Sequence, residues 1–132
     1  MNRKILGISA GAAAIGGLML ATPASASTSP PGGGTWDHVW THDGATLSVE
    51  EHGDVIQLCD TAADGYSAKA YLVWNVSPGV ADSMTLTVAG NGNCVGSDAS
   101  THDITEGKTV NVYISNTGPD STELYVTYLN DN

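Results

Sequence analysis

Residues 45–59 contain two runs of alternating apolar and polar residues with a short turn-forming segment between them. Alternation with a period of two is typical of a β-strand that buries one face. A two-residue turn at His52-Gly53 would join the two runs as an antiparallel hairpin. That register creates two apolar cross-strand pairs, Leu47 with Leu58 and Val49 with Ile56. The segment therefore predicts a hairpin with one apolar face, which needs a second layer to cover it.

The same alternation returns in most of the chain, and no segment beyond residue 26 has a helical period. The further predicted strands are Trp36–His42, Tyr66–Val76, Met84–Val88, Val110–Ser115 and Glu123–Tyr128, with residues 102–105 as a short additional candidate. Turn-forming residues separate them. Seven or eight short strands at this spacing predict an all-β fold, an antiparallel two-layer sandwich with an immunoglobulin-like arrangement as one form of it. A small closed barrel is the alternative.

The N-terminal segment has the features of an export signal. Arg3 and Lys4 precede the uncharged stretch Ile5–Ala21, and Ala24-Ser25-Ala26 provides the pattern of small residues at which signal peptidase cuts. A retained membrane anchor is the alternative, which the glycine- and alanine-rich composition and the cleavage pattern make less favourable. The predicted organisation is a signal peptide at residues 1–26, a flexible leader at 27–35 and one β-sandwich domain at 36–132. We therefore expect a secreted, extracellular product.

Removal of the signal would leave a strongly acidic chain. Only Lys69 and Lys108 would remain against fourteen acidic residues, which gives a formal net charge of −12 with histidine neutral. Such a surface repels phosphate backbones and anionic membranes. We expect no nucleic-acid partner and no membrane association after cleavage. The expected partner is an extracellular ligand of unknown identity, either a protein or a glycan.

Cys59 and Cys94 are the two cysteines of the chain, and two cysteines in an exported protein are expected to pair. The resulting loop closure would stabilise the fold by roughly 3 to 4 kcal/mol in the chain-entropy description. Redox chemistry is a weaker alternative, because neither cysteine belongs to a Cys-x-x-Cys motif. The hairpin register places Cys59 on the face opposite Leu58.

Trp36 and Trp40 fall on the same face of the predicted strand Trp36–His42. At the rise of an extended strand they would lie about 13 Å apart, so they could stack against separate sugar rings of a glycan. The alternative is that the strand turns both tryptophans into the core. We favour the alternative, because Val39 alone cannot anchor the strand from its other face.

Two polar loops, Asp60–Gly65 and Asn91–Asp98, would lie close together if the disulfide forms. Asp60, Asp64 and Asp98 carry the hard oxygen ligands that calcium prefers, so they form a candidate calcium site. Their spacing is not that of an EF-hand, and Asp-Gly and Asn-Gly pairs also serve simply as tight turns. The spacing of the four histidines does not predict a zinc or copper site, and no other cofactor is expected.

The sequence contains no nucleophile elbow, phosphate-binding glycine loop or metalloprotease motif, so we predict that the protein is not an enzyme. Three features of the sequence support a comparison with known proteins: the export signal, the strand pattern and the segment Cys-Asp-x-x-Ala-Asp-Gly at Cys59–Gly65. In these features the chain resembles small exported proteins of Streptomyces and related actinobacteria that have no assigned function. The resemblance implies location and general build only. We therefore expect a non-enzymatic secreted binding or interaction module. A structural or surface-associated self-assembling protein is the alternative, and an unrecognised hydrolase is the third hypothesis.

Overall fold

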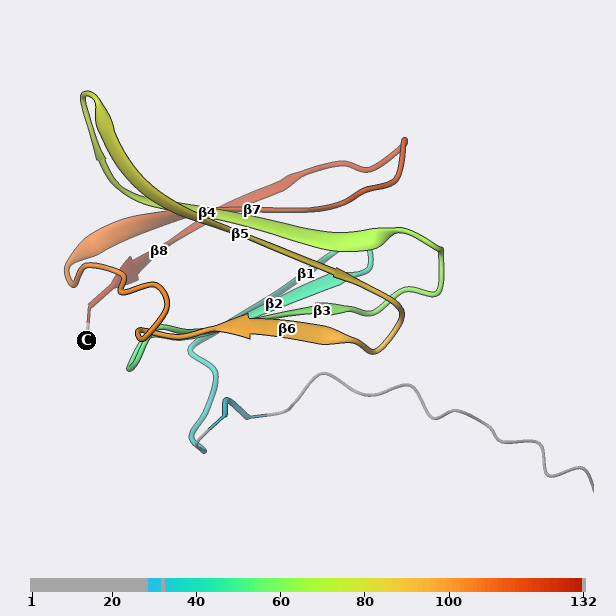
Figure 1. The fold of residues 1–132 in the computed structure, drawn as a ribbon, viewed down its shortest axis with the longest axis horizontal. Coiled ribbons are helices and arrows are strands. Elements are labelled where there is room, and N and C mark those ends of the chain that lie inside the picture. Colours follow the sequence, from blue (N-terminus) through green and yellow to red (C-terminus); the bar gives the residue numbers. More distant parts are fainter. Residues whose placement is uncertain (1–28, 32, 132) are drawn as a thin grey trace, which may run out of the picture.

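The computed structural model describes residues 29–31 and 33–131, so the predicted signal peptide at residues 1–26 lies outside the described residues. The described chain forms eight strands and no helix: β1 (His38–His42), β2 (Ala45–Glu50), β3 (Val55–Asp60), β4 (Ser67–Ser77), β5 (Val80–Ala89), β6 (Cys94–Ser97), β7 (Lys108–Asn116) and β8 (Leu124–Asn130). Sheet A has the order β1-β2-β3-β6, and sheet B has the order β5-β4-β7-β8. All neighbouring strands are antiparallel. Figure 1 shows the two sheets as two layers.

The β2–β3 hairpin has the register that the alternation predicts. Leu47 pairs with Leu58 and Val49 pairs with Ile56. The strands are joined by a turn in which the Asp54 N–H donates to the carbonyl of Glu51 at 3.2 Å. Gly53 occupies this turn with a φ of 102°, a value that glycine adopts without steric cost.

The core lies between the two sheets and consists of the apolar faces of both. Its fully buried side chains from the two layers are Ala45, Leu47, Ile56, Leu58, Ala70, Leu72, Val110, Val112 and Ile114. The remaining inward positions of β4, Ala68 and Trp74, are buried as well, as the alternation of this strand predicts. The predicted two-layer sandwich is confirmed. Because the strands form two separate sheets, the closed barrel is excluded.

The disulfide joins Cys59 and Cys94, as predicted. These residues are paired neighbours on β3 and β6, with their Cα atoms 4.0 Å apart, so the bond lies within sheet A. Immunoglobulin domains use a disulfide between the sheets and a different strand order. Cys59 faces away from the apolar core, in agreement with the hairpin register, although it is buried.

Two details of the strand assignment differ from the prediction. Residues 94–97, which we expected to lie in a polar loop, form β6. Residues 102–105, expected as a short strand, belong instead to the connection between β6 and β7. Ile104 from this connection is nevertheless completely buried in the core. The connection therefore contributes to packing without pairing in a sheet.

Candidate functional site

Three tyrosines cross the outer face of sheet B in a row. Tyr71 of β4 pairs with Tyr113 of β7, and Tyr113 pairs with Tyr125 of β8. The ring centroids lie 5.9 Å apart for the first pair and 5.0 Å for the second, with interplanar angles of 33° and 37°. Their strand neighbours Leu72 and Val112 are buried, so the tyrosines point away from the core. We call these three residues the tyrosine row.

The rings of the tyrosine row are held in place by their neighbours and remain accessible. Tyr71 is 38% exposed and Tyr125 is 54% exposed. The Tyr125 hydroxyl donates a hydrogen bond of 2.8 Å to Oδ1 of Asn111. Rings that already lean on one another lose little conformational freedom when a ligand binds. The row is therefore a preorganised aromatic surface.

Polar side chains flank the tyrosine row on both sides. The cross-strand pair Lys69 and Ser115 lies two residues from Tyr71 and Tyr113 in one direction along the strands. In the other direction lies the pair Val73 and Asn111. Four further hydroxyl groups point outward from neighbouring strands of sheet B, because their residues pair with the outward-facing residues just named or with Tyr71. They belong to Ser83, Thr85, Thr87 and Thr127. The face thus combines aromatic rings with hydroxyl and amide groups.

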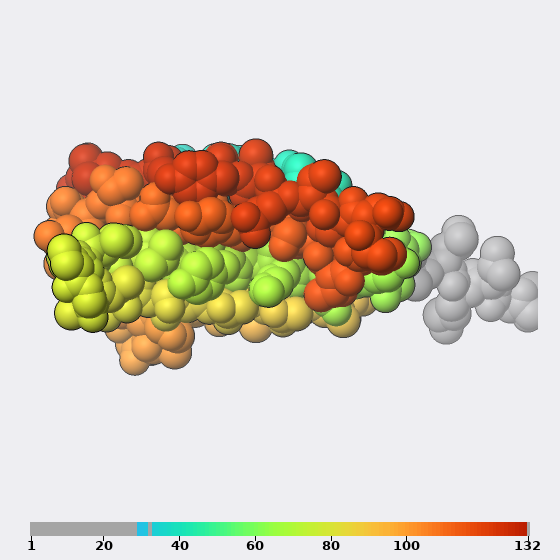
Figure 2. Space-filling model, turned by 90° about the horizontal axis from the view of Figure 1, so that it is seen from above, coloured from blue at the N-terminus to red at the C-terminus, as the bar shows by residue number. Residues whose placement is uncertain are grey.

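The outer face is hollowed beside the row. One hollow of about 540 Å³ is lined by Tyr71, Tyr113, Asn111 and Val76, among others. A second, of about 680 Å³, also includes Asn111 and Val76 in its lining, so the two hollows adjoin. Figure 1 shows the tip of the β4–β5 hairpin curling away from sheet A, and residues of this hairpin line the second hollow. Figure 2 looks onto the outer face of sheet B, with β4, β5, β7 and β8 side by side. We refer to the two adjoining hollows as the outer groove.

The two tryptophans considered as a glycan platform in the sequence analysis do not belong to the outer face of sheet B. Trp40 is half-buried on β1 and packs against the core cluster. Its ring stacks on that of His38, with centroids 5.1 Å apart and planes 3° apart, and it lies 6.0 Å from the ring of Tyr128. Trp36 precedes β1 and is also half-buried. The accessible aromatic surface is therefore centred on the tyrosine row.

The three aspartates proposed as calcium ligands do not gather at one place. Asp60 is buried at the end of β3, and its Oδ1 accepts from the Ala62 N–H. Asp64 is exposed, and its Oδ1 accepts from the Tyr66 N–H. Asp98 follows the opposite end of β6, where hydrogen bonds from Ser100 lower the pKa of its carboxyl.

These carboxylates thus cap local turns, the other role that the sequence allows. In the described part of the chain, no three histidine, cysteine or acidic side chains are grouped closely enough to hold a metal ion.

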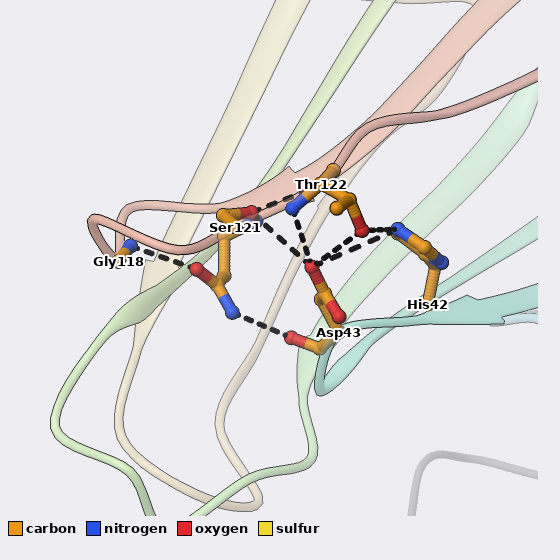
Figure 3. A network of polar contacts seen from close by, with 6 residues as sticks. His42, Asp43, Gly118, Ser121 and Thr122 are labelled. Atoms are coloured by element: carbon orange, nitrogen blue, oxygen red, sulfur yellow. Dashed lines mark hydrogen bonds and ion pairs between the residues drawn. The ribbon is translucent and has the colours of Figure 1, made fainter.

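A polar network at the turn between β1 and β2 joins the two sheets (Figure 3). Oδ2 of Asp43 accepts from the N–H of Thr122 at 2.8 Å and from its hydroxyl at 3.2 Å. The Asp43 carbonyl accepts from the side-chain amide of Asn116 at 3.0 Å. The hydrogen bonds that Oδ2 accepts, above all the one from the Thr122 N–H, lower the pKa of the Asp43 carboxyl. The turn of sheet A is thereby fixed to the connection between β7 and β8.

The same network contains serine, threonine, histidine and aspartate, so it tests the hydrolase hypothesis. In a catalytic triad the nucleophile and the carboxylate bond opposite nitrogens of the histidine ring. Here Nε2 of His42 lies 3.0 Å from Oγ1 of Thr122 and 3.7 Å from Oδ2 of Asp43, so one nitrogen faces both groups. The geometry is that of a structural clamp.

A second aspartate, Asp54, occupies the turn between β2 and β3 and is buried. Its Oδ2 accepts from the Ile104 N–H at 2.9 Å, and its Oδ1 accepts from Nδ2 of Asn130 at 3.2 Å. Burial raises the pKa of this carboxyl, although both hydrogen bonds act in the opposite direction. Asp54 therefore fastens the β6–β7 connection and the end of β8 to sheet A.

Comparison of the chain with family models, with curated proteins and with solved structures gave no match. None of the described residues belongs to a helix long and apolar enough to cross a membrane. The assignment of a function therefore depends on the geometry and chemistry of the molecule itself.

Proposed function

We propose that this protein is a secreted, non-enzymatic binding module that contacts an extracellular ligand with the outer face of sheet B. The tyrosine row is the observation that carries the proposal. Tyrosine offers a large, rigid and amphipathic contact area at a low cost in conformational entropy. It is also among the residues that most often dominate binding energy at interfaces.

The distribution of exposed apolar groups supports the same face. Five of the seven large apolar side chains that are exposed in the described chain lie on the outer side of sheet B or on the β4–β5 hairpin: Tyr71, Val76, Val80, Tyr125 and Leu129. A concentration of such groups on one surface is typical of an interaction site. The disulfide is compatible with an oxidising extracellular location, to which the predicted signal peptide would direct the chain.

Substitution of single residues of the tyrosine row, combined with a screen of soluble ligands, tests the proposal. The screen measures intrinsic fluorescence and thermal stability against neutral oligosaccharides, acidic oligosaccharides and soluble peptides. We expect a saturable response that weakens about tenfold in Tyr71→Ala and in Tyr125→Ala, because each loses an aromatic contact. Tyr66→Ala is the matched control, since Tyr66 is 43% exposed but lies outside the row. Circular dichroism verifies that each variant is folded.

Two results would contradict the binding role. One is the absence of any saturable response across the three ligand classes. The other is an equal loss of binding in Tyr66→Ala, which would show that the row has no special part in recognition.

Self-assembly is the second candidate function, and β5 is the observation that favours it. Among the described residues, this ten-residue strand pairs with β4 alone, so its other edge can accept a further strand. The net charge predicted for the processed chain opposes association, because like-charged copies repel one another. Sedimentation velocity over a range of concentrations separates the two functions. A constant size supports the binding module, whereas growth with concentration supports assembly.

A further inference from the structure

The outer groove has the chemistry of a site for a chain of sugar rings. We propose that its ligand is an extended, uncharged polysaccharide that stacks on the tyrosine row and continues along the outer groove beside the β4–β5 hairpin. This inference rests on the binding role proposed above and adds the chemical class of the ligand.

The charges of this face favour a neutral ligand. Lys69 lies beside the tyrosine row, and Glu123 lines the hollow at the row. Asp82 and Lys108 both line the second hollow. The outer groove therefore has Lys108, Asp82 and Glu123 in its lining and Lys69 beside it, two positive and two negative groups. This balance is close to neutral on a protein whose overall charge repels polyanions, and it gives no excess charge of either sign to a ligand.

The polar groups of the outer groove match the hydroxyl groups of a sugar. Asn75, Asn111, Ser77 and Thr109 line it. Nδ2 of Asn75 already donates to Asp82 and Thr105, and Oδ1 of Asn111 already accepts from Tyr125, so the groups that can bond a ligand are above all the Asn75 oxygen and the hydroxyls of Ser77 and Thr109, which both donate and accept. A sugar hydroxyl also does both, so it can be satisfied in several orientations. The apolar faces of sugar rings can lie against the tyrosine rings at the same time. A protein partner fits the groove less well, since the centres of protein interfaces are depleted of charged residues, and Lys108, Asp82 and Glu123 all belong to its lining.

The outer groove is longer than one sugar ring. It runs along β7 from Thr109, past Asn111, to Tyr113 at the tyrosine row. Four residues of an extended strand span about 13 Å, so several linked rings are needed to occupy the groove. The ligand is therefore a chain, with its stacking contacts at the row and its hydrogen bonds toward Thr109.

Isothermal titration calorimetry on the signal-free protein tests the inference. The neutral probes are cello-, chito-, malto- and xylo-oligosaccharides of one to six rings, polygalacturonate is the acidic probe, and a gelatin digest is the peptide probe. We expect one neutral series to bind, with affinity rising about tenfold or more from one ring to six and little change with added salt. Tyr125→Ala should weaken every member of that series. Thr109→Val should weaken the six-ring ligand about threefold and leave the shortest binding member unchanged.

The outcomes separate the two proposals. If polygalacturonate or the peptides bind in a manner that depends on the tyrosine row, the binding role stands and the ligand class is wrong. If a neutral sugar binds with equal affinity at every length, or if Thr109→Val has no effect on the six-ring ligand, the extended occupancy of the groove is wrong. If no probe of any class binds, the binding role itself falls.

Discussion

The two ends of the sandwich are closed in different ways, although each relies on an aspartate in a turn of sheet A. At one end the disulfide joins β3 to β6, and Asp43 binds the β7–β8 connection through Thr122. At the other end Asp54 binds Ile104 of the β6–β7 connection and Asn130 of β8, without a covalent bond. We call these the disulfide end and the Asp54 end.

Burial is the main difference between the two aspartates. Both have positive φ values, 45° for Asp43 and 53° for Asp54, and both bond a backbone N–H from outside their own turn. Asp43 is exposed, so its hydrogen bonds dominate and its pKa is lowered. Asp54 is only 4% exposed, so desolvation dominates and its pKa is raised. The same group in the same kind of turn thus stabilises the two ends with opposite dependence on protonation.

The largest expected effect is the loss of the covalent link at the disulfide end. The double variant Cys59→Ala/Cys94→Ala should lower the free energy of unfolding by roughly 3 to 4 kcal/mol, because the unfolded chain regains the freedom of the closed loop. Urea unfolding at neutral pH measures the change. Wild-type protein under reducing conditions is the control and should lose a similar amount. A loss below about 1 kcal/mol would mean that the short pairing of β6 with β3 holds this end by itself.

At the Asp54 end we expect a loss of about 2 to 3 kcal/mol in Asp54→Ala, because two buried donors lose their acceptor. Urea unfolding gives the free energy, and amide hydrogen exchange should show faster exchange at Ile104. Asp103→Ala is the control. The Asp103 charge opposes ionisation of Asp54, so removing it should not destabilise this end. Unchanged protection of the Ile104 amide in Asp54→Ala would show that this network does not hold the connection.

Most of the fold could be predicted from local patterns. Alternation in β2 and β3 determines which side chains face inward, and the short turn at Gly53 then leaves one register that pairs Leu47 with Leu58. The disulfide follows from two cysteines in a chain with an export signal. The hairpin register depends only on residues that are close in sequence. The disulfide depends on two cysteines that have no other cysteine to pair with.

The features that escaped prediction depend on contacts between distant segments. Strand β6 contains one apolar residue, Val95, beside a glycine, so it has no alternation to detect, and it is placed by its pairing with β3. Residues 102–105 were expected as a short strand. Ile104 is instead buried in the core from the β6–β7 connection, and its N–H donates to the Asp54 carboxylate, fifty residues away in the sequence.

The tyrosine row was missed for a related reason. Alternation places Tyr71, Tyr113 and Tyr125 on the polar sides of their strands, where single tyrosines are common. Only the order β4-β7-β8 and the register of both pairs bring the three rings together. Trp36 and Trp40 could be considered as a platform because they fall on one face of a single predicted strand, and Trp40 packs against the core, the alternative that we favoured for this strand.

A smaller loss of stability is expected from Asp43→Ala than from Asp54→Ala. The Thr122 N–H and hydroxyl that bond Asp43 are at the surface, so water can replace the carboxylate when it is removed. Urea unfolding of both variants under the same conditions gives the comparison. Ser121→Ala is a milder control, because its hydroxyl lies 3.4 Å from Oδ2 of Asp43. A loss in Asp43→Ala equal to that in Asp54→Ala would show that burial does not determine the contribution of these turns.

The smallest effect is a difference in how the two ends respond to pH. The pKa of Asp54 is raised above its ordinary value of 3.8, so the folded protein binds a proton there more readily than the unfolded chain does. The stability gained from protonating Asp54 is therefore complete at low pH and is lost as pH rises through the folded pKa, while its hydrogen bonds to Ile104 and Asn130 hold the ionised carboxylate as well. Asp43 has a lowered pKa, so its contribution is present above 3.8 and is lost as pH falls through the folded pKa.

Two single variants separate these contributions. Asp54→Asn should flatten the decline in stability on the upper side of this range, and Asp43→Asn should flatten the decline on the lower side. Urea midpoints measured between about pH 3 and pH 7 resolve the two limbs, because stability changes with pH wherever the folded and unfolded states bind different numbers of protons. If Asp43→Asn instead altered the upper limb, or Asp54→Asn the lower one, the assignment of opposite protonation behaviour to the two ends would be wrong. The contrast between the ends would then lie only in the covalent bond.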